Sequence, residues 1–163
     1  MTEPASDSGL VEIRIVGLPL DVWSRAQEHT DGLLREFTLL LAGEAAAIES
    51  RTPRNLLQLI EELEADYAGI TTEQAEQLQS AFLAGQRTID LTYRLPPGVA
   101  AACRRLETAL DEADEYCRNG QYLLTLASPP EVLAFRRWFL GQFVDQVEGS
   151  PPQSWEAWLA SSA

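Results

Sequence analysis

The chain of 163 residues contains no lysine, one histidine and two cysteines. All twelve basic side chains are arginines, so a lysine Schiff base and a lysine general base are both excluded. The cysteines and the histidine form neither a C-x-x-C nor an H-E-x-x-H pattern, which excludes the usual zinc and di-iron motifs. We therefore expect no bound metal and no cofactor.

The glycines are too far apart in the sequence to form a glycine-rich phosphate-binding loop. None of the ten glycines is separated from another by a single residue, so neither the Rossmann fingerprint nor a P-loop can be assembled. A G-x-S-x-G nucleophile elbow is missing as well. Since no recognisable catalytic constellation is present, the sequence predicts a protein that is not an enzyme.

Positive charge is scarce. Twelve arginines stand against 25 acidic residues, which gives a formal net charge of -13 and a pI of about 4.4. Most of the excess lies in residues 1–81, which hold 15 acidic residues and 5 arginines. Such a charge repels phosphate backbones and anionic lipid surfaces. We therefore expect a protein partner rather than nucleic acid or a membrane.

Long hydrophobic runs are missing too. The longest strongly apolar run without charge is Phe37–Gly43, well short of the roughly 20 residues that span a bilayer. The acidic and polar segment Met1–Gly9 has none of the features of a signal peptide and predicts a disordered tail. Cys103 and Cys117 would lie about 21 Å apart on one helix, too far for a disulfide. A cytoplasmic location is the expectation that follows.

Two alternating patterns and one apolar run predict three strands. The first pattern is Val11–Ile15, which leads into Gly17-Leu18-Pro19. The second is Ile89–Leu95, the clearest strand signal in the chain, which Pro96-Pro97 ends. The apolar run Tyr122–Leu126 suits a short buried strand.

Apolar residues that recur every three to four positions predict helices in the rest of the chain. One long helix is expected to begin near Asp21. Gly69 is expected to end the next helix, because Thr71 and Gln74 have the spacing of a capping box that starts a new one. Ser128 and Glu131 have the same spacing ahead of the last long helix. The predicted helices cover residues 21–44, 52–69, 71–85, 99–119 and 128–148.

These elements predict a helix-rich α/β fold in which about five helices cover a small, partly parallel sheet of about three strands. The unit from Thr88 to Leu126 is expected to form a right-handed parallel crossover. A single α/β domain is predicted at residues 10–149. A tail at 1–9 precedes it, and a tryptophan-containing C-terminal segment at 150–163 follows it.

His29 is the one side chain whose ordinary pKa suits a general base near neutral pH. Its neighbours Glu28 and Asp31 would raise that pKa, and Arg25 lies one turn earlier on the same helix. A lone histidine on the polar side of an amphipathic helix is more often a surface or helix-interface residue, and this interpretation is favoured. Arg25 and His29 are therefore weak candidates for a polar site.

The carboxylates between positions 111 and 115 could supply oxygen ligands to Mg²⁺ or Ca²⁺. Side chains on one helix fan around it, so only Asp111 with Asp114 or Glu115 can converge. A solvated acidic face is the simpler interpretation. Asp111, Asp114 and Glu115 are therefore weak candidates for a polar site, and no metal is predicted there.

Two aromatic segments are candidates for binding a partner. In Arg136-Arg137-Trp138, two fixed cations interrupt an apolar helix beside a ring, where they could stack on the aromatic or pair with surface carboxylates. Trp155 and Trp158 share one face of the short terminal segment. Such a pair either anchors a partner or folds back on its own domain.

Several stretches resemble one protein family. Asp111–Arg118, Leu123–Leu126 and Phe135–Trp138 are similar to a family of actinobacterial proteins with no assigned reaction, as is Ile15–Pro19 near the start. The same similarity extends to Pro130-Glu131 and to Trp23, Arg25, Ala26, Glu28, His29 and Asp31.

That resemblance implies a regulatory setting, because members of the family occur alongside partner-switching regulators. These regulators are anti-sigma-factor kinases, their STAS-domain antagonists and the phosphatases that act on them. The chain lacks the Asn-containing helix and the glycine-rich lid of such a kinase, so the resemblance does not imply ATP binding. Its helix-rich first half is also unlike a STAS domain, which leaves a role as a binding component.

Three hypotheses follow. The first is a cytoplasmic, non-enzymatic module that binds other proteins, with the partner-switching pathway as what the resemblance adds. The second is a small-ligand sensor or an atypical enzyme with a pocket at the carboxyl edge of the sheet, around Arg94, Pro96 and Leu126. The third is a homodimer that buries the long first helix.

Overall fold

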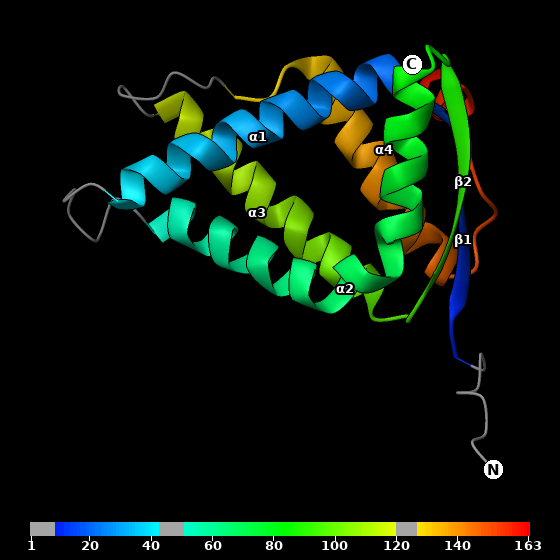
Figure 1. Ribbon diagram of the computed structural model, residues 1–163, viewed down its shortest axis with the longest axis horizontal. Helices are drawn as coiled ribbons and strands as arrows, with labels where there is room; N and C mark the ends of the chain where they lie inside the picture. Colours follow the sequence, from blue (N-terminus) through cyan, green and yellow to red (C-terminus); the bar gives the residue numbers. More distant parts are fainter. Residues whose placement is uncertain (1–8, 43–50, 120–126) are drawn as a thin grey trace.

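The computed structural model of the protein describes residues 9–42, 51–119 and 127–163. Within these residues the chain forms five helices and one sheet of two strands (Figure 1). The helix-rich α/β class predicted from the sequence is confirmed. In chain order the elements are β1 (Val11–Pro19), α1 (Leu20–Ala42), α2 (Arg51–Leu83), β2 (Thr88–Leu95), α3 (Val99–Asn119), α4 (Pro130–Val147) and α5 (Trp155–Ser162).

β1 and β2 pair in antiparallel fashion, with Val11 opposite Leu95. Both strands lie where the alternating patterns predict them. A bulge interrupts the register between Ile15 and Leu18, where Gly17 has a φ of 66°, a conformation that favours glycine. One face of the pair is buried against the helices, and its buried side chains include Ile13, Ile15, Leu91, Tyr93 and Leu95.

The prediction of about three strands with a parallel crossover is wrong for the described residues, which contain two antiparallel strands. The segment expected to form the third strand, Tyr122–Leu126, lies outside the described residues. Helices occupy the outer edges of the pair, because Gln146 of α4 bonds the backbone of β1 and Gln74 of α2 bonds that of β2. In the described residues, glutamine side chains thus bond the outer edges of the pair at Arg14 and Thr92.

The two helices predicted on either side of Gly69 form one continuous helix, α2. A glycine inside a helix costs only about 1 kcal/mol, which the packing of this long helix exceeds. The hydroxyl of Thr71 donates to the carbonyl of Tyr67, four residues earlier, instead of capping a new helix, and Thr72 bonds Ala68 in the same way. Such back-bonding often bends helices, and α2 turns sharply between its two halves in Figure 1.

The two halves of α2 on either side of the bend pack against different elements. Its first half lies beside α1 and α3, whereas its second half runs along β2 (Figure 1). α4 packs against α1, α3 and β1. The larger part of the core surrounds the sheet and α4, where Trp138 is completely buried. A smaller part joins α1, α2 and α3 around Phe37 and Leu56.

The capping box expected at the start of α4 does not form. Pro129 is the N-cap, with no side-chain hydrogen bond, and Pro130 begins the helix. The hydroxyl of Ser128 bonds Asp114 of α3 instead, while Glu131 pairs with Arg25 of α1. Both side chains that would have formed the cap therefore tie α4 to other helices.

Candidate functional site

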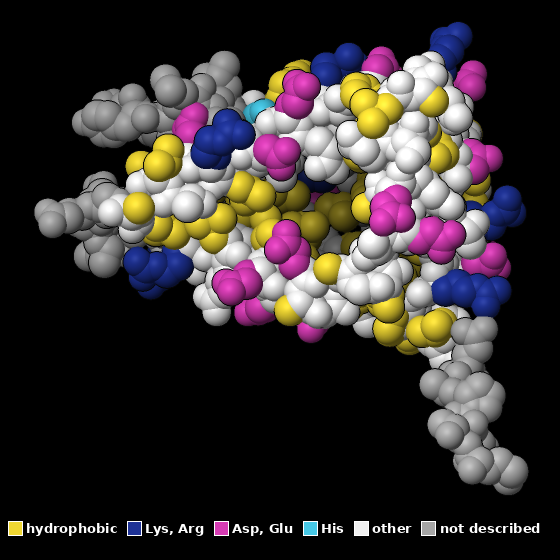
Figure 2. All heavy atoms as spheres, viewed as in Figure 1, with side chains coloured by type: hydrophobic (Ala, Val, Ile, Leu, Met, Phe, Trp, Pro, Cys, Tyr) yellow, Lys and Arg dark blue, Asp and Glu magenta, His cyan; other side chains and the backbone are white. Residues whose placement is uncertain are grey.

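A cavity of about 350 Å³ lies between the four long helices, with Tyr93 of β2 at one side. The face in Figure 2 is hollowed between α1 and α2, and hydrophobic side chains lie in the depth of the hollow. Most of the lining is apolar. The larger apolar lining residues include Trp23, Leu33, Leu78, Leu110, Phe135 and Phe139.

One part of the lining is polar and tightly bonded. Asp114, which is 4% exposed, accepts three hydrogen bonds at its carboxylate. Its Oδ1 atom accepts from the backbone N–H of Ser128 at 2.9 Å and from the Ser128 hydroxyl at 2.8 Å. Its Oδ2 atom accepts from Nη1 of Arg136 at 3.1 Å. A buried carboxylate with three donors is well satisfied.

Arg136 joins this cluster from α4. Its side chain is only 10% exposed, and its second guanidinium nitrogen donates to Asp111 one turn before Asp114. Within the described residues, Nε of Arg136 is buried and has no hydrogen-bond partner. The pairing with carboxylates that the sequence suggested for Arg136 is therefore present, and it is largely buried rather than on the surface.

His29 of α1 completes the polar group. Its Nε2 atom lies 3.3 Å from the Ser128 hydroxyl oxygen. Because that hydroxyl gives its hydrogen to Asp114, its oxygen accepts from Nε2, which leaves Nδ1 of the neutral ring as an acceptor. Burial lowers the pKa of His29 below 6.5; Asp114 raises it in part, and Arg136 lowers it further. The expectation that Glu28 and Asp31 raise this pKa is wrong.

Serine, histidine and aspartate thus meet at one place, but not in the order that activates a nucleophile. In a catalytic triad the serine hydroxyl donates to the histidine, and the histidine donates to the carboxylate. Here the hydroxyl of Ser128 donates to Asp114, so the carboxylate rather than the imidazole holds its hydrogen. This geometry orients fixed dipoles toward a cavity, which suits binding better than acyl transfer.

The other polar candidates lie outside the cavity. Both terminal oxygens of Glu131 accept from Nη2 of Arg25 at 2.8 Å, and both side chains are half-exposed. Glu115 and Arg137 are exposed. Asp111 and Asp114 do converge, as the helix geometry predicts, but they converge on Arg136.

The tryptophan candidates pack on their own domain. Trp138 is 0% exposed and donates its indole hydrogen to the carbonyl of Gln153 at 2.9 Å, so it is out of reach of a partner. Trp155 is half-buried, with its ring centroid 5.6 Å from that of Trp138 in an edge-on contact. Trp158 is also half-buried and stacks on Trp155 at 5.8 Å.

No group of three or more metal-ligating side chains occurs in the described parts of the chain. Among the same residues, every helix is too short or too polar to cross a bilayer. Cys103 and Cys117 are both free and buried, in agreement with the separation expected along one helix.

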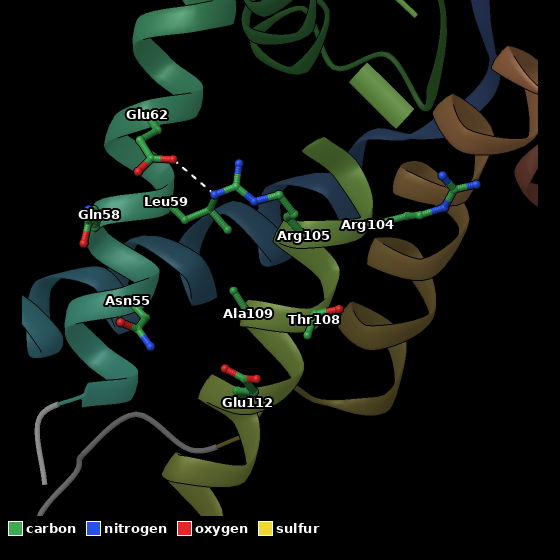
Figure 3. Close-up of a pocket in the computed structure, with 9 residues that line it drawn as sticks. All are labelled: Asn55, Gln58, Leu59, Glu62, Arg104, Arg105, Thr108, Ala109 and Glu112. Atoms are coloured by element: carbon green, nitrogen blue, oxygen red, sulfur yellow. Dashed lines mark hydrogen bonds and ion pairs between the residues drawn. The ribbon is translucent and has the colours of Figure 1, made fainter. Parts of the chain in front are cut away.

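A second hollow, of about 510 Å³, is a polar groove between α2 and α3 (Figure 3). Arg105 reaches across it from α3 toward Glu62 of α2 and bonds its carboxylate at 3.2 Å. Arg104 points away toward α4 and pairs with Glu148. Since Arg104 and Arg105 are paired with Glu148 and Glu62, neither cation of this groove is free for an anionic ligand.

Sequence patterns single out His29, Asp114 and Arg136 separately but do not bring them together. Ser128, which links His29 to Asp114, is expected only as a helix cap. One signal could have pointed to a different role. A proline disfavours helical conformation in the residue before it, so Pro129 and Pro130 keep Ser128 and Pro129 out of α4. The apolar lining is indistinguishable in sequence from ordinary helix core.

Comparisons with known proteins find no matching family model, no similar curated protein and no similar solved structure. The resemblance to an actinobacterial family found alongside partner-switching regulators stays a prediction. What the cavity can do must be inferred from its geometry and chemistry.

Proposed function

We propose that this protein is a non-enzymatic binding protein, which senses or carries a small, largely apolar ligand in the cavity between α1, α2, α3 and α4. The observation that supports it is the cavity itself, about 350 Å³ in volume, with an apolar lining and one polar cluster. Ligand sites in proteins commonly have this size and this composition.

The size of the cavity matters because protein interiors are normally close-packed. The hollow opens on the face shown in Figure 2, so a ligand can enter it from solvent. An apolar occupant would cover Leu78, Leu110 and Phe139 and would be stabilised by the burial of their surface.

The polar cluster supports binding over catalysis. Ser128, His29 and Asp114 are arranged so that the serine hydroxyl is held by the carboxylate. No step of covalent chemistry follows from that order. The cluster instead presents fixed hydrogen-bonding groups, which orient a ligand and give it specificity.

The alternative pocket at the carboxyl edge of the sheet has less support. That proposal centres on Arg94, Pro96 and Leu126, and Leu126 lies outside the described residues. The cavity of about 350 Å³ touches β2 only at Tyr93 and is otherwise formed by helices, and the cavity whose lining includes Leu95, at the end of β2, is smaller and has no charged side chain. The sensor class proposed from the sequence is therefore retained, and its site moves to the helical layer.

The protein-docking hypothesis also has less support from the described residues. Trp138, Trp155 and Trp158 pack on the domain, so they do not project as anchors. A part in a partner-switching pathway remains compatible with ligand sensing, because a sensor can pass its state to other proteins. That pathway is proposed on the family resemblance alone.

The experiment is a binding titration with a neutral hydrophobic dye, phenylnaphthylamine, followed by its fluorescence. Ala26 lines the cavity from α1, and replacing it by phenylalanine fills the space. We expect A26F to weaken dye binding by about tenfold or more. The matched control is A101F, at an exposed position of α3 that lines none of the cavities described, and its affinity should equal that of wild type.

Both variants are checked for cooperative thermal unfolding before the titration. If A26F does not fold, A26L replaces it, since leucine adds less volume. Equal dye binding by the wild type and the folded cavity-filling variant would overturn the proposal.

A further inference from the structure

The ligand cavity adjoins another cavity, which we call the second cavity and which is not the groove between α2 and α3. This second cavity has a volume of about 290 Å³ and lies between the bend of α2, β2, α3 and α4. Four residues line both cavities and form the boundary between them, namely Thr71, Tyr93, Leu106 and Phe139. The two cavities are therefore adjacent, and these four side chains separate them.

The second cavity is more apolar than the first. Its lining contains no charged side chain, and Leu63, Val99 and Phe143 are typical of it. The ionisable groups in it stay neutral near pH 7, because burial raises the pKa of Cys103 to about 12 and also raises the pKa of Tyr93. Polarity thus falls from the cluster around Asp114 in one cavity to a neutral surface in the other.

The charge at the polar end restricts the head group of a ligand. Asp114 lines the cavity and Asp111 lies just outside it, so two carboxylates stand there against the single positive charge of Arg136. The two terminal nitrogens of that guanidinium already donate to these carboxylates, which leaves Nε of Arg136 as its one buried donor without a partner in the described residues. His29 adds no positive charge, since burial lowers its pKa. An anionic head group would meet net repulsion, whereas a hydroxyl can donate to an imidazole nitrogen without charge.

We infer that the ligand is a neutral, unbranched amphipathic molecule, whose hydroxyl-type head binds at the cluster of His29, Asp114 and Ser128 and whose apolar chain extends past Leu106 into the second cavity. This inference rests on the proposed function, because it identifies the ligand class of the same site. Three features support this inference: the ligand cavity has a single polar end, an apolar cavity adjoins it, and negative charge lies beside the head group.

The experiment is isothermal titration calorimetry of the full chain with hexanol, octanol and decanol, and with decanoate as the anionic analogue of decanol. We expect affinity to rise by about fourfold for each added methylene, as burial of a chain predicts. Decanoate should bind at least about tenfold more weakly than decanol.

Two adjacent alanines of α3 test the second cavity directly. Ala102 lines it, whereas Ala101 is exposed. A102F should remove the gain from hexanol to decanol while leaving hexanol binding unchanged, and A101F should behave as wild type. If A102F does not fold, A102L takes its place.

The two cysteines supply a readout inside the wild-type protein. Cys103 lines the second cavity, and Cys117 lies in the smaller part of the core. Burial makes both thiols slow to react with N-ethylmaleimide. Decanol should slow the alkylation of Cys103 by a larger factor than that of Cys117, as measured by mass spectrometry of the peptides.

The outcomes separate this inference from the proposed function. If hexanol binds and decanol binds no more tightly, the chain does not enter the second cavity, and the inference is wrong while the proposed function stands. If decanoate binds as tightly as decanol, the part of the inference that requires a neutral head group is wrong, and the part that places the apolar chain in the second cavity stands. If no alkanol binds the wild type, the inference is overturned, and dye binding in the earlier titration decides the proposed function.

Discussion

The side-chain amide of Gln146 forms two hydrogen bonds with the backbone of Arg14, each 2.8 Å long. It accepts from the backbone N–H and donates to the carbonyl, as a neighbouring strand would. Arg14 lies opposite Thr92 in the sheet, and the carbonyl of Thr92 accepts a 2.7 Å hydrogen bond from Gln74. Two glutamine side chains therefore cap both edges of the sheet at the same pair of residues.

Replacing Gln146 by leucine should destabilise the protein, because both backbone groups of Arg14 lose their partners. A buried polar group without a partner costs about 1–3 kcal/mol, so we expect a loss of about 2 kcal/mol or more in the free energy of unfolding, measured with urea. Q79L, at an exposed position of α2, is the control and should be near neutral. An unchanged urea midpoint for Q146L would contradict the role of the amide as an edge cap.

The two carboxylates that bind Arg136 should differ in what they contribute. Asp114 is almost completely buried, so D114N leaves the guanidinium without its buried charge partner and should cost about 3 kcal/mol. The side chain of Asp111 is 50% exposed, so D111N should cost less than about 1 kcal/mol. Chemical denaturation of both variants checks the order, and equal losses would refute the distinction.

Acid should weaken the protein through His29. Burial, the largest cause, lowers its pKa in the folded state below 6.5, the value expected when the chain is unfolded. As the pH falls through about 6.5, the unfolded chain takes up a proton that the folded chain resists, so the free energy of unfolding decreases. The decrease levels off below the folded pKa, where both states are protonated.

The measurement is the free energy of unfolding of wild type and H29Q between about pH 8 and about pH 5. Titrating carboxylates contribute to both proteins, so the difference between the two curves isolates the histidine. Wild type should lose more stability than H29Q over this range. Parallel curves would show that the environment of His29 does not oppose its protonation.

Removing the paired tryptophans should lower the melting temperature. Trp155 and Trp158 pack against the larger part of the core, so the W155A/W158A double variant loses buried apolar area and ring contacts. Full burial of such side chains is worth about 3–5 kcal/mol each, and these two are half-buried, so we expect a combined loss of about 3–5 kcal/mol. L159A, at an exposed position of α5, is the control. An unchanged melting temperature in the double variant would instead favour the anchor role.

Local patterns predicted the helices and strands well, because periodicity reports directly on which side of an element is buried. The alternation in β1 and β2 is an example, and so is the amphipathic pattern of α3. The pairing of the strands was not predictable in this way. The outer edges of the pair are bonded by Gln74 and Gln146, which reach the sheet from distant helices and look like ordinary surface residues in the sequence.

The same limit applies to the candidate site. Sequence identified His29, Asp114 and Arg136 as unusual residues, since each is a charged or titratable group within a helix. Ser128 links His29 to Asp114, and Asp114 binds Arg136. This arrangement depends on how α1, α3 and α4 cross, which local patterns do not encode. At Gly69 a local pattern misled the prediction instead. A glycine there predicts a helix end, but α2 continues through it and bends where the hydroxyls of Thr71 and Thr72 bond the preceding turn.

The glutamine cap on β1 also sets an order of events during synthesis of the chain on the ribosome. β1 leaves the exit tunnel first, but its partner strand follows only after α1 and α2, and its outer edge is satisfied only once Gln146 has emerged. Until then the strand exposes backbone groups that can pair with other chains. Nascent chains released before α4 should therefore be the form most prone to aggregate and the form most dependent on chaperones.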